Sequence, residues 1–143
     1  LNTVIATADP EYKFLKKYLF KNENAQKIKS WVKSRDMGFY SIEYSYKLNS
    51  HTKVGTFNPD FIIKLDKSEN VYLFIEIKDD GDNSPENKGK YKAAKEHFSL
   101  LNQKYIFHFL SPNDYEIFFQ YLRDDKLDTF VSGLDNLLEE ADK

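Results

Sequence analysis

The chain of 143 residues has no cysteine, which excludes disulfide bonds and thiolate metal sites and fits a reducing cytoplasm. It has no apolar run long enough to cross a membrane as a helix, so we expect no membrane partner. It also has no glycine-rich loop of the kind that cradles nucleotide phosphates. An ATP-driven motor is therefore not expected within these residues.

An excess of one charge is missing too, because 21 lysines and arginines nearly balance 23 acids and leave a net charge of -2. Any surface that binds nucleic acid must then be a local basic patch. The length fits one domain with a sizeable core. Since the first residue is Leu1 and not methionine, we expect residues 1–143 to be a single domain cut from a longer polypeptide.

The strongest pattern is a β-hairpin over residues 58–78, in which two apolar runs flank the polar residues 66–70. If these five residues form the connection, Leu65 faces Val71 and the register of the whole hairpin follows. The second strand is apolar on both faces over most of its length, which indicates a buried central strand.

In that register Asp60 lies opposite Glu76, with Cβ atoms about 5 Å apart. Side chains alternate between the two faces of a strand, so Glu76, Lys78 and Asp60 share a face. They gather at the C-terminal end of the second strand, where open α/β sheets place their sites. The sequence predicts that two acids and a lysine converge there.

Two carboxylates this close repel each other unless a proton or a cation lies between them. Mg²⁺ is usually held by one or two carboxylates together with waters and substrate phosphates, which suggests a phosphodiester substrate. The alternative is a structural ion pair, in which Lys78 neutralises Glu76 and Asp60 only ends a strand after Pro59.

Pro59-Asp60 and Glu76-Ile77-Lys78 resemble the two half-motifs of the PD-(D/E)xK nuclease superfamily. More narrowly, residues 57–62 followed by 74–80 look like the C-terminal endonuclease domain of type III restriction enzymes (the Res subunit) and of related helicase-linked nucleases. The resemblance implies an α/β fold with a restriction-endonuclease-like core, in which helices flank both faces of a central mixed β-sheet.

The resemblance also implies a Mg²⁺-dependent DNA endonuclease of a restriction system, with Mn²⁺ as an alternative ion. Asp60, Glu76 and the Ile77 carbonyl would hold the metal, and Lys78 would orient or activate the attacking water. Many members carry a further acid on the first core helix, which makes Glu11 a catalytic candidate. Its alternative role is favourable interaction with the N-terminus of its own helix.

The expected partners are DNA, a helicase or ATPase domain and a modification subunit of the parent enzyme. The sequence does not separate DNA from RNA. Two other functions stay open, namely a nucleic-acid-binding module that does not cleave and an interaction domain with the same fold. Metal binding and cleavage distinguish these three functions.

A helix begins at Asp9-Pro10, and the spacing of apolar residues predicts a second helix from Ala25 to about Gly38. Alternation then predicts a strand over 39–46, followed by a polar loop over 47–55. Together with the hairpin, this predicts three successive strands in an antiparallel meander.

The next helix begins at Ser84-Pro85 and leads to a short apolar strand over 105–110, which forms a βαβ unit with the strand over 71–77. This helix carries Lys88, Lys92 and Lys95 along one face and Lys90 beside them, the densest basic cluster of the chain. The four lysines are candidates for phosphate contact with a nucleic acid, and the alternative is a solvated helix face.

Overall fold

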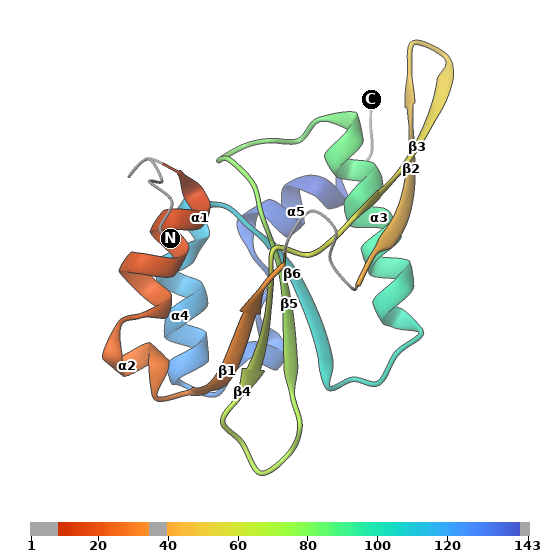
Figure 1. Ribbon diagram of the computed structural model, residues 1–143. Helices are drawn as coiled ribbons and strands as arrows, with labels where there is room; N and C mark the ends of the chain where they lie inside the picture. Colours follow the sequence, from red (N-terminus) through yellow and green to blue (C-terminus); the bar gives the residue numbers. More distant parts are fainter. Residues whose placement is uncertain (1–8, 35–39, 141–143) are drawn as a thin grey trace.

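The computed structural model describes residues 9–34 and 40–140 (Figure 1). In chain order it contains α1 (Pro10–Lys13), a π-helical continuation (Phe14–Leu19), α2 (Asn22–Ala25), β1 (Ile28–Lys33), β2 (Ile42–Leu48), β3 (His51–Phe57), β4 (Phe61–Leu65), β5 (Tyr72–Ile77), α3 (Pro85–Ser99), β6 (Tyr105–Leu110), α4 (Tyr115–Arg123) and α5 (Gly133–Glu139). Within these residues, no helix is both long and apolar enough to cross a membrane.

The central sheet has four strands in the order β1-β4-β5-β6. Strands β4 and β5 are antiparallel, whereas β5 and β6 are parallel and are joined through α3, as the predicted βαβ unit requires. In Figure 1, α1, α2 and α4 lie on one side of this sheet and α3 on the other. The predicted fold class, a mixed sheet with helices on both faces, is confirmed.

The register of the β4–β5 hairpin is the predicted one. Phe61 pairs with Ile75 and Ile63 with Leu73, and the Leu65 amide donates to the Val71 carbonyl across the end of the connection. The same register continued by one residue places Asp60 opposite Glu76. A slip of one residue would have sent one of the two acids to the other face.

The helix predicted from Ala25 to Gly38 is wrong. Helix α2 ends at Ala25, and β1 then pairs antiparallel with β4. A bulge between Ile28 and Ser30 shifts the register, so Ile28 and Trp31 both pack against the same core although they are three residues apart. That spacing is typical of a helix and misled the prediction. Gly38 itself lies outside the described residues.

The polar loop predicted over 47–55 and the meander are also wrong. Strands β2 and β3 form a separate two-stranded sheet, and its turn is made by Asn49 and Ser50, both with positive φ. Most side chains of this hairpin are exposed, which explains its polar sequence. The start of the predicted 39–46 strand, Phe39, lies outside the described residues.

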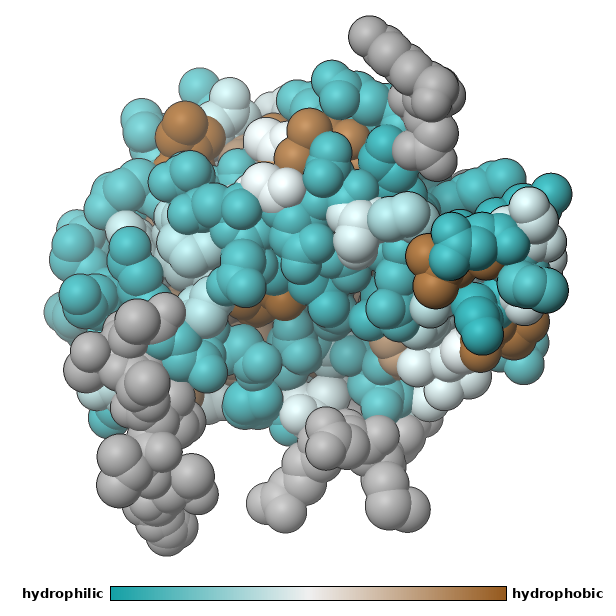
Figure 2. Space-filling view, turned by 90° about the horizontal axis from the view of Figure 1, so that it is seen from above, coloured by the Kyte–Doolittle hydropathy of each residue, from teal (hydrophilic) through white to brown (hydrophobic). Residues whose placement is uncertain are grey.

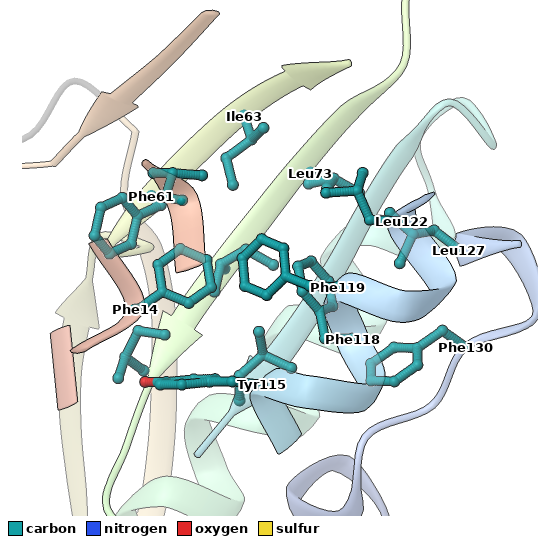
Figure 3. Packing of buried hydrophobic residues seen from close by; sticks show 14 of the residues in the cluster. Phe14, Phe61, Ile63, Leu73, Tyr115, Phe118, Phe119, Leu122, Leu127 and Phe130 are labelled. Carbon is teal, nitrogen blue, oxygen red and sulfur yellow. The ribbon is translucent and has the colours of Figure 1, made fainter. Parts of the chain in front are cut away.

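Two apolar cores fill the spaces on the two sides of the sheet. On one side Phe14, Phe61, Phe118 and Phe119 are fully buried between the sheet and α4, as Figure 3 shows. The second core joins the other face of the sheet to α3, α5 and the base of the β2–β3 hairpin. The two cores therefore hold both the sheet and the hairpin in fixed positions around the end of β5.

Helix α3 packs closely against β2 because Gly89 has no side chain. A Cβ atom there would collide with the backbone oxygen of Ser45 and lie 3.1 Å from Cβ of Tyr46. Glycine is used where another segment of backbone must come this near. The close packing brings side chains of the hairpin, Tyr44 among them, into contact with α3, the helix that follows β5 in sequence.

Candidate active site

The three residues of the predicted triad meet at the C-terminal end of β5. Glu76 belongs to this strand and is only 5% exposed. Lys78 follows the strand, and its backbone amide donates to the Leu110 carbonyl, which extends the pairing with β6. Its Nζ lies 3.2 Å from Oε2 of Glu76.

Asp60 reaches this end of the sheet from the residue before β4. Its Oδ2 accepts a 2.7 Å hydrogen bond from the backbone amide of Ile77. The interaction fixes the carboxyl group beside the last residue of β5. The structure therefore brings Asp60, Glu76, Ile77 and Lys78 together, as the hairpin register predicts.

The surroundings of Asp60 favour its protonated form. Burial, followed by the negative charges of Glu76 and Glu11, raises the pKa of Asp60 to about 8, although the Ile77 amide and Lys78 act in the opposite direction. Burial also raises the pKa of Glu76, and the charges of Lys78 and Lys90 reduce this effect. Near neutral pH the two carboxyl groups thus retain a proton when no cation is bound.

One carboxylate oxygen at this site stands out. Oε1 of Glu76 is buried and has no hydrogen-bond partner within residues 9–34 and 40–140. A buried, unpaired carboxylate oxygen is costly, and a cation would satisfy it. Together with the raised pKa values of both acids, this observation fits a divalent cation held between Asp60 and Glu76.

Among residues 9–34 and 40–140, no group of three or more histidine, aspartate or glutamate side chains is arranged to hold a metal ion. A cation here would have two carboxylates and would need backbone, water or substrate oxygens to complete its shell. That pattern excludes a closed structural site and is the usual one for Mg²⁺ in enzymes that act on phosphates.

Glu11 lies near the same acids. Asp9 caps α1 through the Glu11 amide, at 2.8 Å, and this places Glu11 in the first helical turn. The Glu11 carboxylate forms a 2.5 Å ion pair with Lys33 of β1, while its charge is close enough to raise the pKa of Asp60. Glu11 is thus a neighbour of the acid pair, and Lys33 neutralises it.

The predicted lysine cluster of α3 is not uniform. Lys92 is exposed, Lys88 is partly exposed, and Lys95 forms a 2.7 Å ion pair with Glu139 of α5. Lys90 is partly buried, and burial and the charge of Lys78 lower its pKa, while the charge of Glu76 acts in the opposite direction. The structure therefore places Lys90 near Glu76 and Lys78, whereas Lys92 and Lys95 are exposed.

No sequence pattern indicated that Tyr44 and Glu86 lie beside the site. The Tyr44 hydroxyl donates a 2.6 Å hydrogen bond to Glu86 of α3, and the negative charges of Glu86 and Glu76 both act on Tyr44. Burial, followed by this hydrogen bond, raises the pKa of Tyr44 to about 12. The contact joins residues 42 positions apart, and only the packing of the hairpin on α3 reveals it.

The end of the molecule that carries the site has a mostly hydrophilic surface. Figure 2 views this end and shows mostly hydrophilic residues, with hydrophobic residues in small separate patches. A groove of about 600 Å³, lined by Leu65, Val71 and Ile106 among others, lies at the opposite end of the strands and contains none of the predicted site residues.

Comparison with protein families shows that residues 16–120 match the model of a family described as an endonuclease domain. The matched segment includes Asp60, Glu76, Lys78 and the four lysines of α3, whereas Glu11 precedes it. Comparisons with curated proteins and with solved structures found no match.

Proposed function

This chain belongs to the endonuclease domain family, and we propose that it is a Mg²⁺-dependent DNA endonuclease that hydrolyses phosphodiester bonds. The observation that carries the proposal is the convergence of the buried Glu76, the partly buried Asp60 and Lys78 at the end of β5, where Asp60 accepts from the Ile77 amide and Lys78 forms an ion pair with Glu76. A PD-(D/E)xK nuclease requires this arrangement of its two half-motifs.

Asp60, Glu76 and the Ile77 carbonyl would hold Mg²⁺, with Mn²⁺ as a substitute. When bound, the ion supplies Lewis-acid polarisation of the phosphate and a lowered pKa for a coordinated water. The two acids are pre-positioned for this task by the hairpin register and by the Ile77 amide. Binding of a divalent cation would displace the proton that the pair retains near neutral pH.

Lys78 would act as a charged hydrogen-bond donor. Burial lowers the pKa of Lys78, but the charge and hydrogen bond of Glu76 and the charge of Asp60 outweigh burial and raise it above the ordinary lysine value. A protonated ammonium can orient water and stabilise charge that develops on phosphate oxygens. It cannot accept the proton of the attacking water, so that proton must pass to another group or to solvent.

Glu11 supports the site through its charge next to Asp60, and its ion pair with Lys33 limits the repulsion. Lys88, Lys92 and Lys95 are proposed as outer contacts to the phosphate backbone, which depend on salt as all such contacts do.

We place the domain in a type III restriction enzyme of the cytoplasm. This part of the proposal is supported by the residues flanking Asp60 and Glu76, which look like those of the Res subunit. A helicase or ATPase domain and a modification subunit would then be its protein partners. ATP hydrolysis would take place outside these 143 residues, which contain no phosphate-binding glycine loop.

The test is cleavage of supercoiled plasmid DNA with Mg²⁺ by the starting protein, by Lys78→Ala and by Lys67→Ala. Lys67 is an exposed lysine in the β4–β5 connection at the far end of the strands and serves as the matched control. Loss of one charged donor at a reacting centre costs about 10²–10³ in rate. Cleavage by Lys78→Ala at the rate of the control would contradict the proposed role.

A further inference from the structure

Lys90 of α3 is held in place by aromatic rings of the β2–β3 hairpin. Its Nζ lies 5.3 Å from the ring centroid of Tyr44 and 5.7 Å from that of Phe57. Both rings are themselves buried in the second apolar core. A lysine side chain on a helix surface is ordinarily mobile, but these two cation–π contacts give Lys90 a defined position.

The same ammonium group lies close enough to Lys78 for the charge of Lys78 to act on it, and Glu76 acts on both lysines. Burial and the charge of Lys78 lower the pKa of Lys90. Like charges repel, so the two ammonium groups depend on nearby anions. Glu76 supplies one negative charge to both lysines, and Glu86 supplies another to Lys90.

Binding of a divalent cation by Asp60 and Glu76 would remove most of this compensation. The two carboxylates would be neutralised by the ion, and Lys78 and Lys90 would remain as adjacent positive charges. Glu86 would still offset part of the charge of Lys90, and an anion beside the two lysines would offset more. A phosphate group fits this role because its two non-bridging oxygens can each accept a hydrogen bond from one ammonium group.

We propose that Lys78 and Lys90 together form a phosphate-binding site, in which Lys90 holds a phosphate of the nucleic-acid backbone next to the acid pair. The identification of the phosphate as part of a nucleic acid rests on the proposed nuclease function, whereas the anion site itself rests on the contacts of Lys90. Lys90 is a binding residue of the centre, distinct from the exposed lysines of the same helix.

The hairpin has a positioning role in this arrangement. Tyr44 contacts Lys90 through its ring and Glu86 through its hydroxyl, at 2.6 Å, so one side chain fixes both charged residues of α3. The β2–β3 hairpin is outside the central sheet, and orientation of Lys90 gives it a function at the site. If Lys90 served only to pack against the rings, an uncharged side chain of similar length would replace it without loss of phosphate binding.

The experiment uses inorganic phosphate as the probe. Melting temperatures are measured in phosphate and in chloride at equal ionic strength, with and without Mg²⁺, for the starting protein, Lys90→Met, Lys90→Gln and the control Lys67→Met. Methionine keeps an unbranched apolar stem against the rings but removes the charge. We expect phosphate to raise the melting temperature of the starting protein and of the control, and to raise it more when Mg²⁺ is present. In both Lys90 variants this increase in melting temperature should be mostly lost.

A fluorescent duplex oligonucleotide provides the second measurement. With Ca²⁺ in place of Mg²⁺, Lys90→Met should weaken binding about tenfold and reduce the slope of log affinity against log salt by about one. An equal phosphate effect in Lys90→Met and the control, or no phosphate effect in the starting protein, would overturn the inference. A phosphate effect that depends on Lys90, in a protein that neither binds nor cleaves DNA, would uphold the anion site and overturn the proposed nuclease function.

Discussion

Asp60 accepts a 2.7 Å hydrogen bond from the backbone amide of Ile77, and this bond joins the residue before β4 to the last residue of β5. The amide lies between Glu76 and Lys78 in sequence. The bond therefore connects the first half-motif, Pro59-Asp60, to the backbone of the second, Glu76-Ile77-Lys78. Because the Ile77 end of the bond is backbone, changing the side chain of Glu76 or Lys78 would leave Asp60 a partner in the same place.

This bond makes Asp60→Asn an informative variant. Asparagine can still accept from the Ile77 amide, while the repulsion between the carboxyl groups of residues 60 and 76 is removed. We predict that the metal-free domain becomes equally or slightly more stable, by about 1 kcal/mol, as measured by urea denaturation with a chelator. Asp66→Asn, in the exposed β4–β5 connection, is the control.

The alternative, a structural ion pair, predicts that Asp60→Asn makes the domain less stable. If Asp60 served mainly to compensate Lys78, its loss would leave a partly buried ammonium without a partner and would cost about 3–5 kcal/mol. A loss of that size in the free energy of unfolding, measured by urea denaturation, would favour the ion pair over the nuclease site.

The raised pKa of Asp60 predicts how the stability of the metal-free domain depends on pH. Folding raises this pKa from 3.8 to about 8, so the folded state binds the proton more tightly than the unfolded chain does. The stabilisation is fully present below the unfolded value and is lost as pH rises toward 8, with a slope of up to about 1.4 kcal/mol per pH unit for one proton.

Denaturation at a series of pH values tests this directly. The starting protein should lose stability from acidic to mildly alkaline pH, and Asp60→Asn should lose much less over the same range. Equal pH dependence in the two proteins would mean that Asp60 does not titrate as its surroundings imply.

Gly89→Ala tests the packing that brings the hairpin to the site. Alanine in an exposed helix interior stabilises by about 1 kcal/mol relative to glycine. Here the added Cβ would collide with the backbone of Ser45, so we predict a loss of about 1–3 kcal/mol. Calorimetric melting shows whether this variant is less or more stable than the starting protein. Ser99→Ala, at an exposed position of the same helix, is the control. Stabilisation would show that α3 is not packed against β2.

The sequence predicted the centre of the fold because local rules determined it. A five-residue connection and strict alternation fixed the register of β4 and β5, and hence the meeting of Asp60 and Glu76. Helix α3 was predictable from Ser84, whose side chain caps the helix, and from Pro85 in its first turn. The parallel strand β6 followed from its apolar run and the intervening helix.

The elements that the sequence did not predict depend on contacts between distant segments. The bulge in β1 gave Ile28 and Trp31 the spacing of a helix, and only pairing with β4 made this segment a strand. The β2–β3 hairpin is polar because it is exposed. The place of Lys90 beside Lys78 depends on rings of that hairpin, so no pattern within α3 could distinguish Lys90 from its neighbours.

The most direct test of the central claim, that Asp60 and Glu76 jointly hold a divalent cation, is calorimetric titration of Mg²⁺ into the domain at mildly alkaline pH. We predict that the starting protein and Asp66→Asn bind the ion, that proton release accompanies binding near neutral pH, and that Asp60→Asn and Glu76→Gln both lose most of the affinity. Mg²⁺ binding of equal strength by Asp60→Asn and the starting protein, or no binding by either, would contradict the account.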